Sequence, residues 1–398
     1  MRDIHIENNI PAHIWDVCHR FYSAGEDAYI VGGSLRDIML GRAPSDFDLA
    51  TSALPQRTAE LFSDMRVIET GIKHGTVTVI VGGAPVEITT FRIDGSYTDS
   101  RHPDGVSFTG RIEEDLARRD FTVNAMAYND RSGLVDPFGG RDDLRDGIIR
   151  AVGDSRRRFS EDALRIMRAF RFSAQLGFEI DYGTLSGAKE QREGLANIAR
   201  ERIAVEFLKL ITSKEPEAAL TLMTKAEALT YITGEYRPSE RIFSLISKMP
   251  CDEGARLGFF LSEASEDAAR SVLRGLKYSN ALTTAALAVI RGSRHGVESP
   301  ADARKLIGEC GAYARSAACA SVLLGLSCAD APLWVEKNTA PTSLRDLCVT
   351  GKDLMEIGVT GKKVGRVLGA LLAAVIEEPR LNEREMLIKM AEDILNKA

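Results

Sequence analysis

The chain has 398 residues, of which 44% are hydrophobic and 27% are charged, and its formal net charge is −6. This composition is typical of a globular protein of about two to three domains and excludes a collagen-like or intrinsically disordered chain. The N-terminus lacks the apolar stretch of a secretory signal, and the most apolar run, residues 364–376, is too short to span a bilayer. We therefore expect a cytoplasmic protein.

Two kinds of sequence pattern follow each other along the chain. Up to about residue 150, short β-rich runs alternate with glycine-containing turns. From Ser160 onward, apolar residues recur at helical spacing and strand patterns disappear, which predicts an α/β head followed by a long helical body. The predicted strands are Ala28–Val31, Phe47–Leu49, Thr76–Val81, Val86–Phe91, Val106–Thr109 and Ala125–Tyr128.

The first candidate site is a glycine turn, Gly32-Gly33-Ser34-Leu35-Arg36-Asp37, between a predicted strand and a predicted helix. Paired glycines allow a ligand to approach the backbone, and N–H groups at a helix start suit a phosphate. Alone, such a turn is more often structural than functional.

A pair of carboxylates follows this turn. Residues i and i+2 of a strand project from the same face, so Asp46 and Asp48 are expected to lie side by side. Two such charges repel unless a cation lies between them, and their hard oxygen atoms favour Mg²⁺. A solvated strand edge is the alternative interpretation, but the glycine turn upstream favours a metal and phosphate site, to which Glu87 on a later strand would add a third carboxylate.

Basic residues concentrate in one segment of this acidic chain. Residues 150–209 contain 12 Lys and Arg against 9 Asp and Glu. A local basic stripe can follow a phosphate backbone even in an acidic protein. The same segment contains Ser160, which is followed by two acidic residues and is therefore the predicted start of a helix.

Asp162 and Arg165 lie three residues apart in that predicted helix and therefore on one face. Cytosine and adenine present an amine donor beside a ring-nitrogen acceptor, whereas uracil and guanine present the reverse. An Asp–Arg pair complements the first two bases and leaves buried groups of the others unpaired, at about 1–3 kcal/mol each. Glu161 would hold Arg165 in place. An ordinary surface ion pair is the alternative.

Five motifs, in order and with plausible spacing, resemble those of the DNA polymerase β-like nucleotidyltransferases. The glycine turn and Asp46–Thr51 resemble the opening motif of that superfamily. The others resemble one branch of it, the bacterial-type (class II) tRNA nucleotidyltransferases and bacterial poly(A) polymerases. They are residues 118–127 (RRDFTVNAMA), 136–144 (DPFGGRDDL), 161–172 (EDALRIMRAFRF) and 200–206 (RERIAVE).

The resemblance implies an α+β fold in four parts: a polymerase-β-like head of mixed sheet and helices (1–146), a helical neck with a nucleotide-base template (147–211), a helical body (212–300) and a helical, tRNA-binding tail (301–398). It also implies roles for individual residues. These are catalysis by Asp46, Asp48 and Glu87, with metal binding by Asp46 and Asp48; phosphate or ribose binding by Gly32, Gly33, Ser34, Arg36, Arg119, Asp120 and Asn124; base selection by Glu161, Asp162, Arg165 and Arg168; and a flexible loop that contains Asp99 and Arg101.

The function predicted from this resemblance is template-independent addition of CCA to the 3′ end of tRNA. CTP and ATP would be the substrates, two Mg²⁺ ions the cofactors, and pyrophosphate the released product. The expected partner is tRNA, at its 3′ end and its acceptor and elbow region, with neither DNA nor a membrane. Alternatives are an enzyme that adds only CC or only A, a bacterial poly(A) polymerase, and a non-catalytic RNA-binding protein on the same scaffold.

Overall fold

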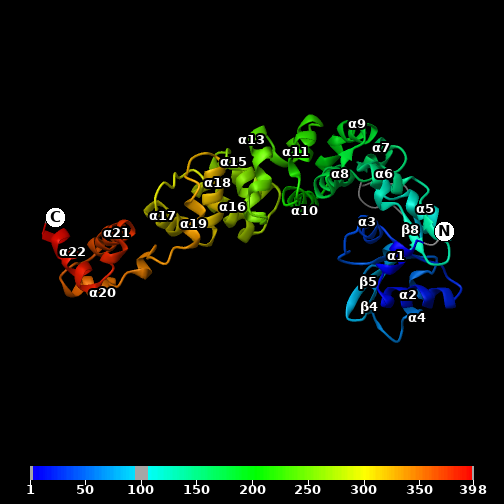
Figure 1. The fold of residues 1–398 in the computed structure, drawn as a ribbon, viewed down its shortest axis with the longest axis horizontal. Coiled ribbons are helices and arrows are strands. Elements are labelled where there is room, and N and C mark those ends of the chain that lie inside the picture. The colour runs from blue at the N-terminus through cyan, green and yellow to red at the C-terminus, as the bar shows by residue number, and fades with distance from the viewer. Residues whose placement is uncertain (1–2, 95–105, 397–398) are drawn as a thin grey trace. The chain divides into compact units, whose positions relative to one another are not determined.

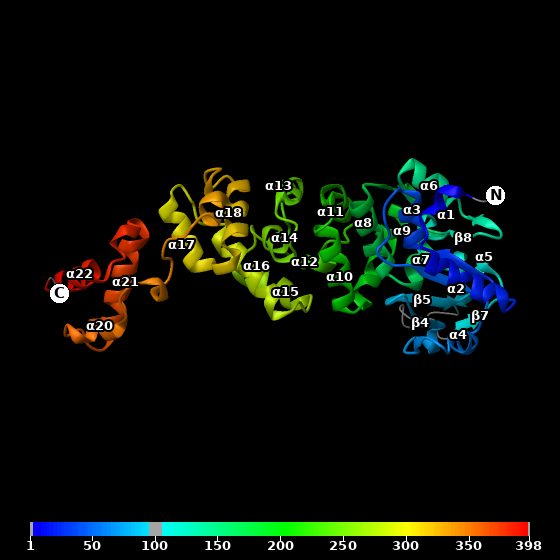
Figure 2. The ribbon, with the colours of Figure 1, turned by 60° about the horizontal axis from the view of Figure 1, so that its bottom comes forward.

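The computed structural model describes residues 3–94 and 106–396, and the chain divides into two compact units. The first unit comprises residues 1–210 and 218–232, and the second comprises residues 211–217 and 233–398. The described strands all belong to the first unit, and the described part of the second unit is helical (Figures 1 and 2). The predicted α+β class is therefore confirmed, whereas the division into four parts stays a prediction.

Seven strands of the first unit form one mixed sheet in the order β3-β4-β5-β2-β1-β8-β9. Within it, β2 and β5 run parallel and the other neighbours run antiparallel. Two short pairs stand apart: β6 with β7, antiparallel, and β10 with β11, parallel. The strands are β1 (Ala28–Val31), β2 (Asp48–Thr51), β3 (Arg66–Ile68), β4 (Thr76–Val81), β5 (Ala84–Thr90), β6 (Arg92–Asp94), β7 (Val106–Phe108), β8 (Ala127–Asn129), β9 (Gly133–Val135), β10 (Ile148–Ile149) and β11 (Glu179–Ile180).

Helices surround this sheet and continue the first unit beyond it. The last three of them reach the boundary between the two units. They are α1 (Ile4–Asn8), α2 (Ala12–Ser23), α3 (Gly33–Met39), α4 (Pro55–Leu61), α5 (Ile112–Ala117), α6 (Gly140–Asp146), α7 (Ser155–Glu161), α8 (Leu164–Leu176), α9 (Tyr182–Glu190), α10 (Arg200–Ile211), α11 (Pro216–Lys225) and α12 (Thr230–Thr233).

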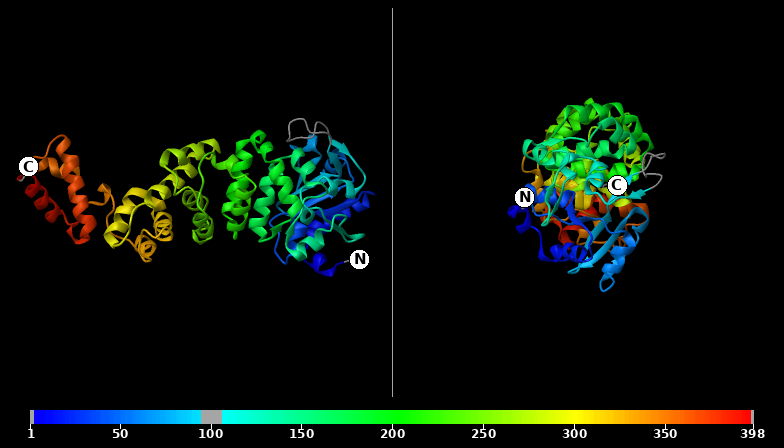
Figure 3. Two further views of the ribbon diagram at one scale, coloured as in Figure 1. Left: turned by 90° about the horizontal axis from the view of Figure 1, so that it is seen from above. Right: turned by 90° about the vertical axis from the view of Figure 1, so that its right-hand side faces the viewer.

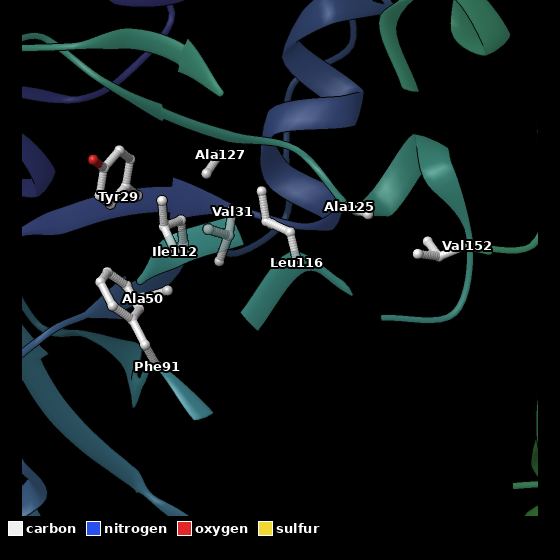
Figure 4. Close-up of a cluster of buried hydrophobic side chains, with 9 residues drawn as sticks. All are labelled: Tyr29, Val31, Ala50, Phe91, Ile112, Leu116, Ala125, Ala127 and Val152. Atoms are coloured by element: carbon white, nitrogen blue, oxygen red, sulfur yellow. The ribbon is translucent and has the colours of Figure 1, made fainter. Parts of the chain in front are cut away.

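A buried apolar cluster on one face of the sheet supports the candidate site (Figure 4). Ala50 of β2 belongs to this cluster, and because alternate strand residues share a face, Asp48 lies on the same face at the start of the strand. Helix α5 packs here through Ile112 and Leu116, and Arg119 follows directly after its end. The fold thus places the Arg119 segment near the start of strand β2, where Asp48 lies.

The described part of the second unit consists of helices (Figure 3). Two separate apolar clusters lie among them, one around residues 297–331 and one around residues 347–391. Helices α14 and α16 pack closely: a Cβ at Gly258 would lie 2.7 Å from the Cβ of Val289, so only glycine fits. The helices are α13 (Glu240–Leu245), α14 (Glu253–Phe260), α15 (Glu266–Gly275), α16 (Asn280–Gly292), α17 (Pro300–Cys310), α18 (Ala314–Leu323), α19 (Ala331–Glu336), α20 (Gly351–Glu356), α21 (Lys362–Glu377) and α22 (Arg384–Asn396). None of the helices in the described ranges combines the length and the apolar character that a membrane-crossing segment requires.

Two local predictions near the candidate site are wrong. Strand β2 begins at Asp48, so Asp46 lies in a bend before the strand and not beside Asp48 within it. No helix begins at Ser160, which lies inside α7; that helix starts earlier because the Asp154 carboxylate caps it by accepting the Arg157 N–H. The pair β10–β11 also shows that one short strand follows residue 160, where none was expected.

Candidate active site

A cavity of about 480 Å³ in the first unit collects most of the predicted site residues. Its walls come from the glycine turn before α3, the start of β2, the segment after α5, the junction of α7 with α8, and α10. The lining residues are Gly32, Gly33, Arg36, Asp48, Arg118, Arg119, Asp120, Asn124, Asp162, Leu164, Arg165, Arg168, Arg171, Phe172 and Arg202. Seven of these are arginines and three are aspartates, so the cavity carries an excess of positive charge suited to an anionic ligand.

Asp48 lies at one end of the cavity, and two further carboxylates, Asp46 and Glu87, lie outside the lining but close enough for their negative charge to act on it. Asp48 and Glu87 are register partners on the parallel strands β2 and β5, and Asp46 precedes β2. Burial, together with the charges of Asp46 and Glu87, raises the pKa of Asp48 to about 6 against the opposing effect of Arg119. In the described residues none of these three carboxylates forms an ion pair with a basic side chain.

The donor set at this end fits Mg²⁺. No group of three or more acidic, histidine or cysteine side chains in the described residues is close enough to form a metal-ligand cluster by itself. Magnesium does not require such a cluster, because proteins commonly hold it with one or two carboxylates together with substrate phosphates and water. Asp48, half-buried beside two further carboxylates, is therefore a suitable ligand, with Asp46 as the second.

The backbone of the glycine turn approaches both the carboxylate end and the arginines. Gly32 has a φ of +71°, which side chains rarely adopt, and a Cβ there would lie 3.1 Å from Arg119 Nη1 and 3.8 Å from Asp48 Oδ2. Any larger residue would strain the turn and crowd the Arg119 guanidinium, while its Cβ would lie in ordinary contact with Asp48. The geometry shows two protein side chains close to Gly32, and the predicted approach of a phosphate to this turn stays a prediction.

A hydrogen-bonded network connects the glycine turn to α8. Arg36 Nη1 donates to Asn124 Oδ1 (2.9 Å), Asn124 Nδ2 donates to Asp120 Oδ1 (3.2 Å), and Arg168 Nε donates to Asp120 Oδ2 (2.7 Å). Burial alone would raise the pKa of Asp120, but the charge and hydrogen bonds of Arg168, together with Asn124, hold it at about 2. Ser34 lies outside the cavity lining, because its buried hydroxyl donates to the Val31 carbonyl (3.1 Å).

The end of the cavity that contains Asp162 and Arg165, named the template end after the role predicted from the sequence, is organised around the junction of α7 with α8. Asp162 has an extended backbone (φ −143°, ψ 103°) that separates the two helices, and its Oδ1 accepts the Leu164 N–H (2.9 Å). Asp162 and Arg165 therefore do not share a helical face as predicted, yet both line the cavity. Arg165 Nη1 donates to Glu161 Oε2 (2.8 Å), so the expected support by Glu161 is present in the geometry although Glu161 itself lies outside the lining.

Backbone carbonyls fix Arg165 further. Its Nη1 donates to the carbonyl of Arg158 (3.1 Å) and its Nη2 to the carbonyl of Arg118 (2.9 Å). A guanidinium has five N–H donors, so these bonds leave donors of Arg165 for a ligand while its position is held from three sides. The template end thus presents a fixed donor next to the fixed acceptor Asp162.

Sequence reasoning missed five lining residues: Arg118, Leu164, Arg171, Phe172 and Arg202. Arg202 Nη2 donates to Asp162 Oδ2 (3.1 Å), while its Nη1 is buried without a hydrogen-bond partner in the described structure. Arg202 belongs to the last of the five motifs, which was the available signal. Asp99 and Arg101, the predicted loop residues, lie outside the described residues.

Together these contacts define what the cavity can do. The carboxylate end can bind a divalent cation, the arginines can bind phosphates, and the Asp162–Arg165 pair can bind the hydrogen-bonding edge of a base. A nucleoside triphosphate presents all three chemistries in one molecule. The cavity volume, about 480 Å³, falls in the range of about 300–1,000 Å³ that small-molecule sites occupy.

Three family models match the chain. They are the poly A polymerase head domain over residues 28–150, the "probable RNA and SrmB-binding site of polymerase A" over residues 177–237, and the putative tRNA nucleotidyltransferase domain 2 over residues 252–391. The first two contain most of the residues that line the cavity, and the third lies within the second unit.

The curated relatives and the solved structure described here are all named as CCA-adding enzymes. The CCA-adding enzyme of Leuconostoc citreum is 36% identical over 388 residues, which cover 94% of each chain. That of Leuconostoc mesenteroides is 48% identical over 213 residues, which cover 54% of this chain and 53% of the relative. The crystal structure of the Bacillus stearothermophilus CCA-adding enzyme in complex with CTP matches with a TM-score of 0.82 and 32% identity, over 97% of this chain and 98% of that one.

Proposed function

Because the chain belongs to the family of CCA-adding enzymes, which are tRNA nucleotidyltransferases, we propose that it adds CCA to the 3′ end of tRNA from CTP and ATP. One observation carries the proposal: a single cavity is lined by both Asp48 and the Asp162–Arg165 pair. An enzyme that selects its nucleotide without a nucleic-acid template needs a carboxylate for metal binding and a pair of side chains for reading the base in the same cavity.

In the proposed reaction, the tRNA 3′-hydroxyl attacks the α-phosphate of the bound nucleotide and pyrophosphate leaves. Asp46 and Asp48 would hold two Mg²⁺ ions, which supply charge neutralisation and activation of the hydroxyl when bound. Arg36 and Arg119 would orient the phosphates. The chain's own contribution is positioning and electrostatic stabilisation, since phosphoryl transfer asks for little covalent work from the protein.

Base choice would follow from donor and acceptor positions. Asp162 accepts from the exocyclic amine of cytosine or adenine, and Arg165 donates to the adjacent ring nitrogen. Uracil and guanine would place a carbonyl against the carboxylate and an N–H against the guanidinium, leaving both protein groups unpaired. The arrangement therefore admits CTP and ATP and opposes UTP and GTP.

The test is incubation of the protein with Mg²⁺ and a tRNA that ends before CCA, with each of the four labelled nucleotides singly and in combination. CCA addition predicts two C residues with CTP, one further A with CTP and ATP, and almost no UTP or GTP incorporation. Product that stops at CC, A addition only to tRNA ending in CC, or long A tails would identify the three enzymatic alternatives. No incorporation by folded protein would contradict the proposal.

The change from C to A is proposed to depend on the segment between β6 and β7, which contains Asp99 and Arg101. Its glycines, proline and polar residues have the composition of a flexible loop. Shortening it is expected to leave both C additions and to abolish the terminal A. Complete CCA synthesis by the shortened protein would contradict this role and leave the nucleotide cavity unaffected.

The second unit is proposed to hold the acceptor and elbow region of tRNA. Lys352, Lys362, Lys363 and Arg366 of α20 and α21 are all exposed, as contacts to an RNA backbone require. Charge-reversing changes at these positions should raise the KM for tRNA without changing the KM for CTP. A cytoplasmic location remains a prediction from the sequence.

A further inference from the structure

Phe172 occupies an unusual position in the cavity. It belongs to α8, lines the cavity, and is only 6% exposed. The Cζ atom of Arg171 lies 3.8 Å from the centroid of its ring, and those of Arg36 and Arg168 each lie 5.2 Å from it. Three positive side chains therefore share one aromatic ring.

This concentration of like charge requires compensation. Each guanidinium has a carboxylate partner: Arg36 pairs with Asp37 (2.8 Å), Arg168 with Asp120 (2.6 Å) and Arg171 with Glu206. The aromatic ring compensates the positive charge further, because the negative face of such a ring attracts a cation within about 6 Å. The carboxylates balance the charges, while the ring provides the common surface that fixes where the guanidiniums lie relative to one another.

We propose that Phe172 is a positioning residue for nucleotide binding, whose ring keeps Arg36 and Arg168 in place for the sugar and phosphates. The proposal rests on the proposed function of the cavity. Both arginines belong to the network through Asn124 and Asp120, the groups expected to face ribose and phosphates. Displacing them would weaken binding of any nucleoside triphosphate, whatever its base.

Base choice should be independent of Phe172. The sequence resemblance grouped Arg168 with the base-selecting residues, but its ion pairs are with Asp120 and Glu206 and not with Asp162, so we place it with the sugar and phosphate contacts. Arg165 is held by Glu161 and by the carbonyls of Arg158 and Arg118, and Asp162 by Arg202 and the Leu164 N–H. None of these contacts involves the ring. Phe172 and the template pair thus act on two separable quantities, the overall affinity for nucleotide and the preference among nucleotides.

The test compares Phe172→Leu with Phe121→Leu in the full-length protein. Phe121 packs edge-on against Phe172, with ring centroids 5.8 Å apart and planes at 80°, and is fully buried, but it does not line the cavity. Both changes remove a buried ring, so they match in their effect on the core. Titration calorimetry with CTP and with ATP in Mg²⁺ gives the affinities, and thermal unfolding gives the stability.

Phe172→Leu is expected to weaken CTP and ATP binding by about tenfold each, with an unchanged preference over UTP and GTP. Phe121→Leu should lower the melting temperature with little effect on affinity, and Phe172→Tyr, which keeps the ring, should bind nearly as wild type. If Phe172→Leu fails to fold, Phe172→Met, which is unbranched, replaces it in the same comparison.

Wild-type affinity in the folded Phe172→Leu or Phe172→Met protein would overturn the proposal while leaving the proposed function intact. Equal loss of affinity in the Phe121 and Phe172 variants would also overturn it, because the ring would then act only through the core. If the wild-type protein bound neither CTP nor ATP, the proposed function would fail, and this proposal with it.

Discussion

The two ends of the cavity differ in whether their carboxylates form ion pairs with arginines. At the template end, Glu161 pairs with Arg165 and Asp162 pairs with Arg202. At the other end, Asp48 has no such ion pair within the described residues, and its pKa is raised to about 6 by burial and by the neighbouring acidic groups. At the template end, basic side chains of the protein itself balance the carboxylate charges, whereas at the Asp48 end the carboxylate charge is not balanced by an ion pair.

The difference corresponds to two kinds of recognition. A balanced pair held by several hydrogen bonds can discriminate ligands by donor and acceptor pattern, since neither group must move or change charge. A cluster of uncompensated carboxylates gains most from a cation, since the cation removes their mutual repulsion. We therefore expect substitutions at the two ends to change different observables.

The largest expected effect is at the Asp48 end. Asp48→Asn preserves size and removes the charge, and should reduce the rate of nucleotide addition by about a thousandfold, because several kcal/mol of metal-dependent stabilisation are lost. Asp46→Ala should act in the same direction. Single-turnover incorporation of labelled CTP measures the effect.

Asp64→Asn provides a control, because Asp64 is an exposed residue of the same unit whose partner is Arg20. It should incorporate CTP at the wild-type rate. Near wild-type incorporation by Asp46→Ala or Asp48→Asn would remove the metal assignment from that residue.

At the template end, Arg165→Ala should lower the preference for CTP over UTP by about tenfold to a hundredfold, the cost of one to two unpaired buried groups. Arg157→Ala is a matched control: Arg157 also pairs with Glu161, at 3.2 Å, but its side chain is 75% exposed and does not line the cavity. The ratio of kcat/KM values for CTP and UTP reports the difference. Full retention of this preference in Arg165→Ala would show that the base is read elsewhere.

A smaller change in the same quantity is expected from Arg202→Ala, because Asp162 keeps its contact to the Leu164 N–H and loses only one orienting bond. The preference for CTP over UTP should fall by about threefold to tenfold. Arg200→Ala, which removes a donor to the Tyr231 carbonyl at 2.6 Å outside the cavity, should leave the preference unchanged. If Arg202→Ala lowered the preference for CTP over UTP more than Arg165→Ala does, Arg202 and not Arg165 would make the larger contribution to base selection.

The last prediction concerns stability and not nucleotide addition. The pKa of Asp48 in the folded protein, about 6, exceeds its ordinary value of 3.8, so the folded state binds this proton more tightly than the unfolded chain. Its ionisation therefore destabilises the fold above pH 6, and the penalty disappears as the pH falls from 6 towards 4. Without metal at pH 7.5, Asp48→Asn should be about 1–2 kcal/mol more stable than wild type.

Thermal unfolding in EDTA at pH 7.5 and pH 4.5 measures this difference, which should shrink at the lower pH. Added Mg²⁺ should raise the melting temperature of the wild-type protein more than that of Asp48→Asn, because a ligand that binds only the folded state stabilises it. Identical pH and Mg²⁺ dependence of the two proteins would contradict the description of Asp48 as an uncompensated metal ligand.

The sequence predicted the parts of the fold that depend on local pattern. The alternating apolar residues of β4 and the apolar run of β1 give strands with the predicted limits. The start of α7 was missed because Asp154 is an earlier cap than Ser160, and the break at Asp162 because its carboxylate accepts the nearby Leu164 N–H in place of a continuous helix. These boundaries are set by local side-chain to backbone hydrogen bonds, which apolar periodicity does not reveal.

The residues of the candidate site also divide into those that a local sequence motif predicts and those that it does not. Gly32, Asp48, Asp162 and Arg165 were predicted because each belongs to a short motif with its own chemistry. Phe172 was included in the 161–172 motif without a role of its own, and Arg202 lies 40 residues from Asp162, to which it bonds. Their involvement arises from the packing of α8 and α10 around one cavity, which no spacing rule expresses.

Asp162 performs two tasks with its two oxygen atoms: Oδ1 caps the start of α8 and Oδ2 binds Arg202 beside the base-reading face. Asparagine at this position could cap α8 only by turning its amide NH₂ toward Arg202, a donor against a donor. Alanine would give up both contacts, and the lost cap alone costs about 1 kcal/mol. Substitutions of Asp162 are therefore expected to lower the melting temperature together with any nucleotide preference, because the same carboxylate holds the start of α8 and orients Arg202.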